Sequence, residues 1–130
     1  MKALLPPGWP RPKGYSNAMA ARGRIIVTAG VVGWDEQERF ASDTLAGQFA
    51  QALRNILAIL ECDGAGPANI ARMTCYVTDI DAYRASLTEI GAAWKEIIGR
   101  HYPAMGLVAV TALVEPQALV EIEATAVVPE

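Results

Sequence analysis

Few side chains of this sequence could take part in acid–base chemistry. His101 is the only imidazole, the group that most readily exchanges protons near neutral pH. It follows a predicted helix end, where a cation interacts favourably with the helix dipole, so capping is the alternative role. Glu121 and Glu123 lie two residues apart, and a partly desolvated carboxylate can accept a proton from water. The alternative is that both are exposed on the polar face of a strand.

The sequence contains no motif for a nucleophile triad or a phosphate-binding loop. Its two cysteines, Cys62 and Cys75, and its single histidine are too few for a disulfide framework or a zinc site. We therefore expect no metal and no cofactor, and we expect both cysteines to be buried free thiols in a reducing compartment.

Composition limits the class of protein. With 130 residues, 52% hydrophobic and 19% charged, the chain is long enough for one domain and is apolar enough to suggest oligomerisation. The net charge of −3 and the scattered cations argue against nucleic-acid binding as its function. No apolar run approaches the ~20 residues of a membrane span, and Ala3-Leu4-Leu5 is too short for a signal peptide. We expect a cytoplasmic protein.

The hydrophobic pattern predicts the elements that position these side chains. Four prolines within residues 1–13 predict an extended N-terminal arm, followed by a single domain over residues 14–130. The predicted elements are a strand at 25–29 extended through 31–32, a helix capped by Ser42 or Asp43, a strand at 72–78, a helix at 82–98 capped by Asp81, and strands at 107–114 and 119–128.

The resulting order, β-β-α-β-α-β-β, predicts an α+β fold in which both helices cover one face of a mixed sheet. In the last strand, Val120, Ile122, Ala124 and Ala126 alternate with Glu121, Glu123 and Thr125. The sheet face without helices would then need a partner.

Three short segments together resemble one known family. Residues 15–18 (Tyr-Ser-Asn-Ala), 101–105 (His-Tyr-Pro-Ala-Met) and 120–124 (Val-Glu-Ile-Glu-Ala) are similar, in order and spacing, to motifs of the reactive-intermediate deaminase family (RidA, or YjgF). The resemblance covers residues 15–127. It implies a chorismate-mutase-like fold that assembles as a homotrimer, with a small-molecule ligand bound in clefts between subunits.

The resemblance also assigns roles. Glu121 matches a glutamate similar to one thought to hold or activate the hydrolytic water, and Tyr15 matches a tyrosine whose hydroxyl could bind substrate or water. Gly30 matches a glycine whose neighbouring backbone N–H groups would orient the substrate. For Tyr15, packing with a solvated hydroxyl is the alternative role.

The chain departs from the family at polar positions. Met105 replaces the arginine that grips the substrate carboxylate, Val31 replaces a glutamine, and Leu87 lies near a position that is often asparagine. Losing one side of such a buried ion pair costs ~3–5 kcal/mol. Methionine could instead simply fill an irregular gap in the core.

Two functions remain open, and a ribonuclease is kept only as a possibility that the family resemblance implies. The first is a deaminase that hydrolyses an enamine or imine lacking the usual carboxylate contact, with Glu121 positioning water and Met105, Val31, Leu87 and His101 among the substrate-binding residues. The second is a non-catalytic trimeric module that binds a ligand or a protein in the cleft.

Overall fold

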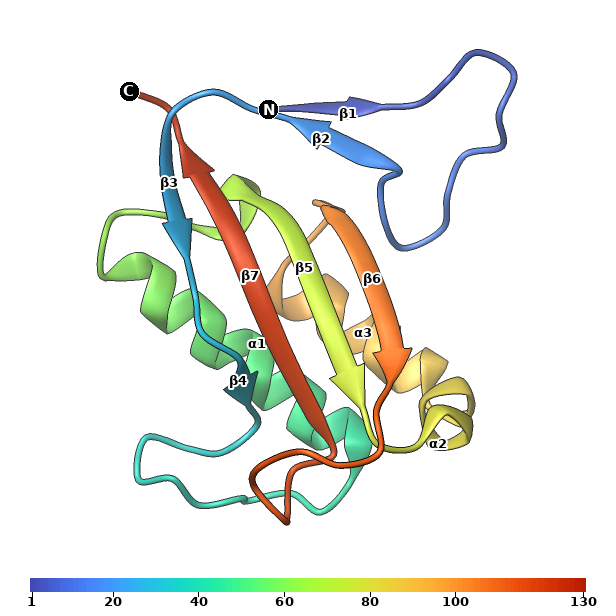
Figure 1. Cartoon of the computed structure of the whole chain (residues 1–130), viewed down its shortest axis with the longest axis vertical. Helices are drawn as coiled ribbons and strands as arrows, with labels where there is room; N and C mark the ends of the chain where they lie inside the picture. Colours follow the sequence, from blue (N-terminus) through green and yellow to red (C-terminus); the bar gives the residue numbers. More distant parts are fainter.

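A mixed β-sheet is covered on one face by helices, as the α+β prediction requires (Figure 1). The computed structural model describes all 130 residues. Its elements are β1 (Lys2–Leu4), β2 (Ala18–Ala20), β3 (Arg24–Val27), β4 (Val31–Val32), α1 (Leu45–Glu61), a 3-10 turn (Pro67–Asn69), β5 (Ile70–Val77), α2 (Ile80–Ala85), α3 (Leu87–Ile97), β6 (Ala104–Ala109) and β7 (Val120–Val128). The main sheet has the order β3-β7-β5-β6, and β4 also pairs with β7.

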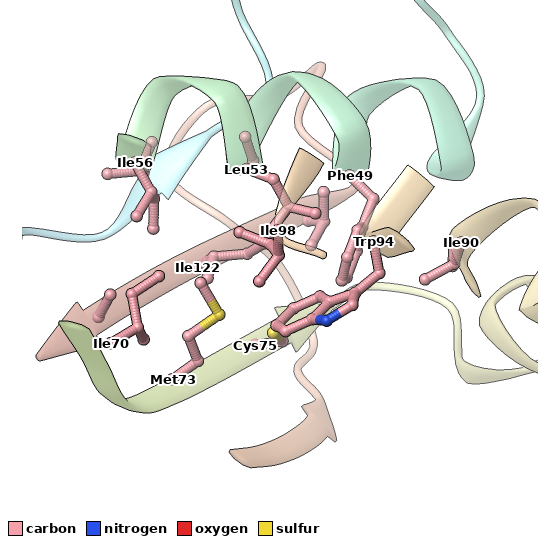
Figure 2. Packing of buried hydrophobic residues seen from close by; sticks show 14 of the residues in the cluster. Phe49, Leu53, Ile56, Ile70, Met73, Cys75, Ile90, Trp94, Ile98 and Ile122 are labelled. Carbon is pink, nitrogen blue, oxygen red and sulfur yellow. The ribbon is translucent and has the colours of Figure 1, made fainter. Parts of the chain in front are cut away.

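Helix α1 supplies the largest part of the core. The Thr44 hydroxyl, rather than Ser42 or Asp43, caps its N-terminus by accepting a hydrogen bond from the N–H of Gly47 at 3.1 Å. Its buried stripe contains Phe49, Leu53 and Ile56, which face the sheet (Figure 2). Each fully buried side chain of this size stabilises the fold by ~1.5–3 kcal/mol.

Strand β7 divides the sheet into two chemically different faces. Val120, Ile122, Ala124 and Ala126 are buried in the core cluster under the helices. Glu121, Glu123 and Thr125 point to the face that no helix covers. The predicted alternation is therefore confirmed, and the face without helices is called the open face below.

The predicted second helix is two helices. The chain leaves helical geometry at Ser86, whose hydroxyl donates to the Ala82 carbonyl at 2.7 Å instead of remaining in solvent. Asp79, rather than Asp81, caps α2 by accepting from the N–H of Ala82 at 3.0 Å. The break ends α2 at Ala85 and starts α3 at Leu87.

The strand predicted at 107–114 begins and ends earlier, as β6. It runs parallel to β5, with Met105 opposite Met73, and it forms an edge of the sheet. Buried Gln48 holds the long connection to β7: its side-chain amide donates to the Ser42 and Gln117 carbonyls at 3.0 Å and accepts from the N–H of Leu119 at 2.8 Å. These contacts satisfy backbone groups of the loop before α1 and of the connection just before β7.

The N-terminal segment lies outside the main sheet. Strands β1 and β2 form a separate antiparallel pair, with Lys2 opposite Ala20 (Figure 1). The segment between them returns to the body at Ser16, whose N–H donates to the Pro103 carbonyl at 3.0 Å. None of the helices has the length and apolar character needed to cross a membrane.

Candidate functional site

A cavity of about 450 Å³ lies between β6, helix α3 and the segment that precedes β2. We call it the Met105 pocket; nine of its 12 lining residues are hydrophobic. The lining residues used below are Lys13, Tyr15, Tyr83, Leu87, Trp94, Tyr102 and Met105. A mostly apolar cavity of this size is typical of a small-molecule site.

Met105 forms part of the inner wall because its side chain points toward the helices. It packs against the core, and its sulfur lies 3.8 Å from the thiol sulfur of Cys75. Burial raises the pKa of Cys75 to about 12, so this thiol stays protonated at neutral pH and can donate to the thioether. Cys62, by contrast, is exposed at the end of α1, so the prediction that both cysteines are buried is wrong for Cys62.

Aromatic side chains form another wall of the pocket. The rings of Trp94 and Tyr102 stack with centroids 6.3 Å apart and planes 10° from parallel. The indole N–H of Trp94 donates to the His101 carbonyl at 3.1 Å, which fixes the ring. Tyr83 is half-buried at the same cavity, and burial raises its pKa, as does the nearby Cys75. These surroundings favour uncharged groups inside the pocket.

Tyr15 reaches the pocket from the N-terminal segment. Gly14 adopts a φ of +79°, a conformation that glycine accepts without steric cost, and Ser16 then joins the edge of β6 beside Ala104. The Tyr15 side chain is 43% exposed, which leaves room for a ligand to contact it.

His101 does not line the Met105 pocket. Its ring Nε2 lies 2.6 Å from the Ile70 carbonyl oxygen, and the residue contributes to a different cavity together with Met1, Ser16 and Met19. This geometry supports a role in joining the end of α3 to β5.

Glu121 lies on the open face, across the sheet from the Met105 pocket. Its β5 neighbour is Tyr76, and Gly30 approaches its carboxylate so closely that a Cβ at Gly30 would overlap it. Gly30 lies in the kink between β3 and β4, where regular pairing with β7 is interrupted and the Thr28 hydroxyl accepts a hydrogen bond from the N–H of Ala124 at 3.0 Å. The side chain of Val31 turns the other way and belongs to the core cluster.

A second polar group on the open face lies beside Glu121. The Tyr76 hydroxyl donates to the Glu123 carboxylate at 2.9 Å, and this hydrogen bond is the main cause of the raised pKa of Tyr76. Glu123 also borders a cavity of about 210 Å³ together with Arg72 and Thr74. No group of three or more histidine, cysteine, aspartate or glutamate side chains is close enough to hold a metal ion.

One chain therefore presents two separate groups of predicted site residues. Tyr15, Leu87 and Met105 line the Met105 pocket, whereas Gly30 and Glu121 meet on the open face. Sequence reasoning did not single out Lys13, Trp94 or Tyr102 for the pocket. The helical spacing of Trp94 from Leu87 was a usable signal, but Lys13 depends on a turn that the sequence does not specify.

Comparison with known proteins agrees with this arrangement of elements. The family model described as Endoribonuclease L-PSP matches residues 10–128. The chain belongs to this family. Its relatives also carry the names RutC, YjgF and Rid.

Two family members illustrate the degree of similarity. A RutC family protein of Synechocystis is 31% identical, over 99% of this chain and 98% of its own length. A Rid family protein of unknown function, YyfB from Yersinia pestis, is 30% identical, with 98% of both chains covered and a TM-score of 0.86.

A third relative has a higher sequence identity to this chain than these two and a lower TM-score than the Yersinia pestis protein. This member of the YjgF/YER057c/UK114 family from Mycobacterium tuberculosis is 39% identical, covers 88% of this chain and 87% of its own, and has a TM-score of 0.67. The mixed sheet with helices on one face is thus the fold of this L-PSP family member.

Proposed function

We propose that the protein is a hydrolytic deaminase that acts on a small enamine or imine. The observation that carries the proposal is the contact between the Glu121 carboxylate and Gly30 on the open face. Glycine leaves the carboxylate approachable, and the backbone at the β3–β4 kink can orient a substrate next to it. Membership in a family that includes Rid proteins supports a Rid-like function in general.

The proposed reaction follows from the chemistry of the C=N bond. A water molecule held by Glu121 attacks the imine carbon, and the carboxylate accepts a proton as the C–O bond forms. The resulting carbinolamine then breaks its C–N bond, with the nitrogen protonated, and releases a carbonyl compound and ammonia. An enamine enters the same route after protonation at carbon gives its imine.

Assembly of several copies is part of the proposal, because the pocket and Glu121 face opposite sides of one sheet. Ile25 and Val27 on the open face are 67% and 70% exposed in the single chain, which favours coverage by a second copy. We propose a homotrimer in which the Met105 pocket of one copy and Glu121 of its neighbour form the cleft. Tyr15 would hydrogen-bond the substrate or its water there.

The substrate is proposed to lack the usual carboxylate contact. Met105 offers no charge, and Leu87 adds a further apolar side chain, 53% exposed, at the start of α3. Val31 contributes its backbone, since its side chain is in the core. His101 stays outside this cleft in the single chain.

Ammonia release from a panel of enamines, with and without a carboxylate, tests the activity. Glu121→Gln should lower turnover by about 10²–10⁴-fold, the range for losing a general base, while binding is retained. Glu123→Gln is the matched control on the same face and should retain most activity. Equal loss in both variants, or no ammonia above background from any substrate, would contradict the proposal.

A non-catalytic ligand-binding module is the second candidate. The observation that favours it is the absence of a carboxylate or imidazole among the lining residues of the Met105 pocket. In that case Glu121→Ala would leave ligand binding intact and there would be no turnover to lose. Neither candidate involves a cofactor, a membrane or nucleic acid, and both suit a cytoplasmic protein.

A further inference from the structure

Lys13 is the only charged residue that lines the Met105 pocket. Its side chain is exposed, and it takes part in neither of the two ion pairs of the chain, Arg24–Asp63 and Arg84–Asp81. A lysine can rest its hydrocarbon stem on apolar surface and keep its ammonium group at the rim. The pocket thus combines an apolar interior with one unpaired cation at its mouth.

The position of Lys13 is fixed by its neighbours in the chain. Gly14 turns the backbone, and Ser16 fastens the segment to the edge of β6 through the Pro103 carbonyl. Both the cation and Met105 are therefore carried on segments that meet at this edge.

The interior suits a flat apolar group. The Trp94 and Tyr102 rings, nearly parallel, offer aromatic surface, and Leu87 and Met105 add flexible aliphatic and thioether surface. Aromatic groups gain from such contacts beyond the area they bury. No acidic side chain lines the pocket to repel an anion.

We infer that the Met105 pocket binds a ligand with an apolar, preferably aromatic, body and an anionic group that pairs with Lys13. This inference rests on the proposed function only in taking the pocket as the ligand site. It specifies the substrate class as apolar molecules that carry an anionic group. That group is bound by Lys13 at the mouth of the pocket, on a different element from Met105. Recognition then depends on both parts of the ligand.

Two probes that differ in charge test the inference on the full-length protein: 4-phenylbutyrate and its uncharged amide, 4-phenylbutanamide. Binding is followed by NMR of ¹³C-labelled methionine methyl groups. The four methionines serve different purposes, because Met105 lines the pocket, Met73 is an internal reference in the core, and Met1 and Met19 report on the other cavity.

We expect both probes to shift the Met105 signal, with the carboxylate binding about two- to fivefold more tightly, the range for one exposed ion pair. Lys13→Gln should abolish this preference and leave the dissociation constant of the amide unchanged. Lys13→Arg should keep the preference. Arg11→Gln, which removes a cation from the same segment outside the pocket lining, is the matched control and should also keep it.

Four results would overturn the inference. Equal affinity of both probes in the unmodified protein would remove the role of Lys13, and an equal loss for both in Lys13→Gln would show that the lysine acts by packing. Shifts confined to Met1 and Met19, or no shift at millimolar probe, would exclude the pocket. Binding is measured without turnover, so an inactive protein that discriminates the probes would contradict the deaminase proposal alone.

Discussion

Met105 and Glu121 lie on opposite faces of the same sheet. Met105 pairs in register with Met73 and faces the helices, whereas Glu121 pairs with Tyr76 and faces away from them. Strand β5 separates their strands, so no side-chain rotation brings the two together over one ligand within a chain. Joint action requires a second copy of the protein.

The first prediction concerns this assembly. Val27→Glu should convert the assembled protein to monomers, because it places a charge among exposed apolar residues and beside the cavity that Glu123 also lines. Light scattering after size-exclusion chromatography measures the mass. Ile59→Glu changes a 44% exposed isoleucine on α1 and should leave the mass unchanged. An assembled Val27→Glu variant, or a monomeric unmodified protein, would contradict assembly through the open face.

The second prediction concerns the close approach of Gly30 to Glu121. Gly30→Ala should lower turnover by at least about tenfold, because the added methyl displaces the carboxylate, which carries the proposed base. Thermal stability should change little, since a flexible side chain can move away. Gly66→Ala, where an added Cβ meets open space, is the control. Unchanged ammonia release in Gly30→Ala would argue against a catalytic position for this carboxylate.

The third prediction concerns Met105. Met105→Arg should weaken binding of uncharged apolar probes and improve turnover of carboxylate-bearing enamines, because it puts a guanidinium on the inner wall. Met105→Leu keeps an apolar side chain and should preserve the original preference. Steady-state kinetics with paired substrates, acid and amide, gives the ratio for each variant. If Met105→Arg leaves that ratio unchanged, residue 105 does not contact the substrate.

The fourth prediction concerns pH and Cys75. Burial raises its pKa from 9.0 to about 12, so above pH 9 the unfolded chain loses a proton that the folded chain retains. The free energy of unfolding should therefore fall by ~1.4 kcal/mol per pH unit from this group between pH 9 and 12. Stability from this source is complete below pH 9.

Urea unfolding at several pH values measures this slope. Cys75→Ala should flatten the part between pH 9 and 10, below the range where Tyr76 and Tyr83, with raised pKa values, contribute in the same direction. Cys62→Ala changes the exposed cysteine and should leave the slope unaltered. A slope that persists in Cys75→Ala would mean that another group causes it.

The sequence was sufficient for elements whose pattern is long and regular. The apolar repeats of α1 and the alternation of β7 predicted which side chains are buried, because in both elements the apolar positions form the face that packs into the core. The start of the short strand β6 was predicted at residue 107 rather than at Ala104, because glycine and alanine at its start carry little strand signal. At the helix break, the Ser86 hydroxyl donates a hydrogen bond to the Ala82 carbonyl. A single serine within a helical pattern is only a weak sequence signal for such a break.

The site was harder to predict for a topological reason. Tyr15, Met105 and Glu121 were identified from a family resemblance, which says nothing about the sheet face each occupies. That information comes from register: β7 turns Glu121 outward by the same alternation that turns Ile122 inward. Lys13 carried no signal at all, because its position depends on the left-handed turn at Gly14.

The fastening of the N-terminal segment at Ser16 has an evolutionary consequence. Residue 13 helps to line the pocket but belongs to neither the sheet nor the core cluster. Exposed substitutions of this kind typically change folding free energy by within about 0.5 kcal/mol. Mutation at this position can therefore alter ligand choice without a stability cost, so the fold can acquire new specificities while its core stays under separate selection.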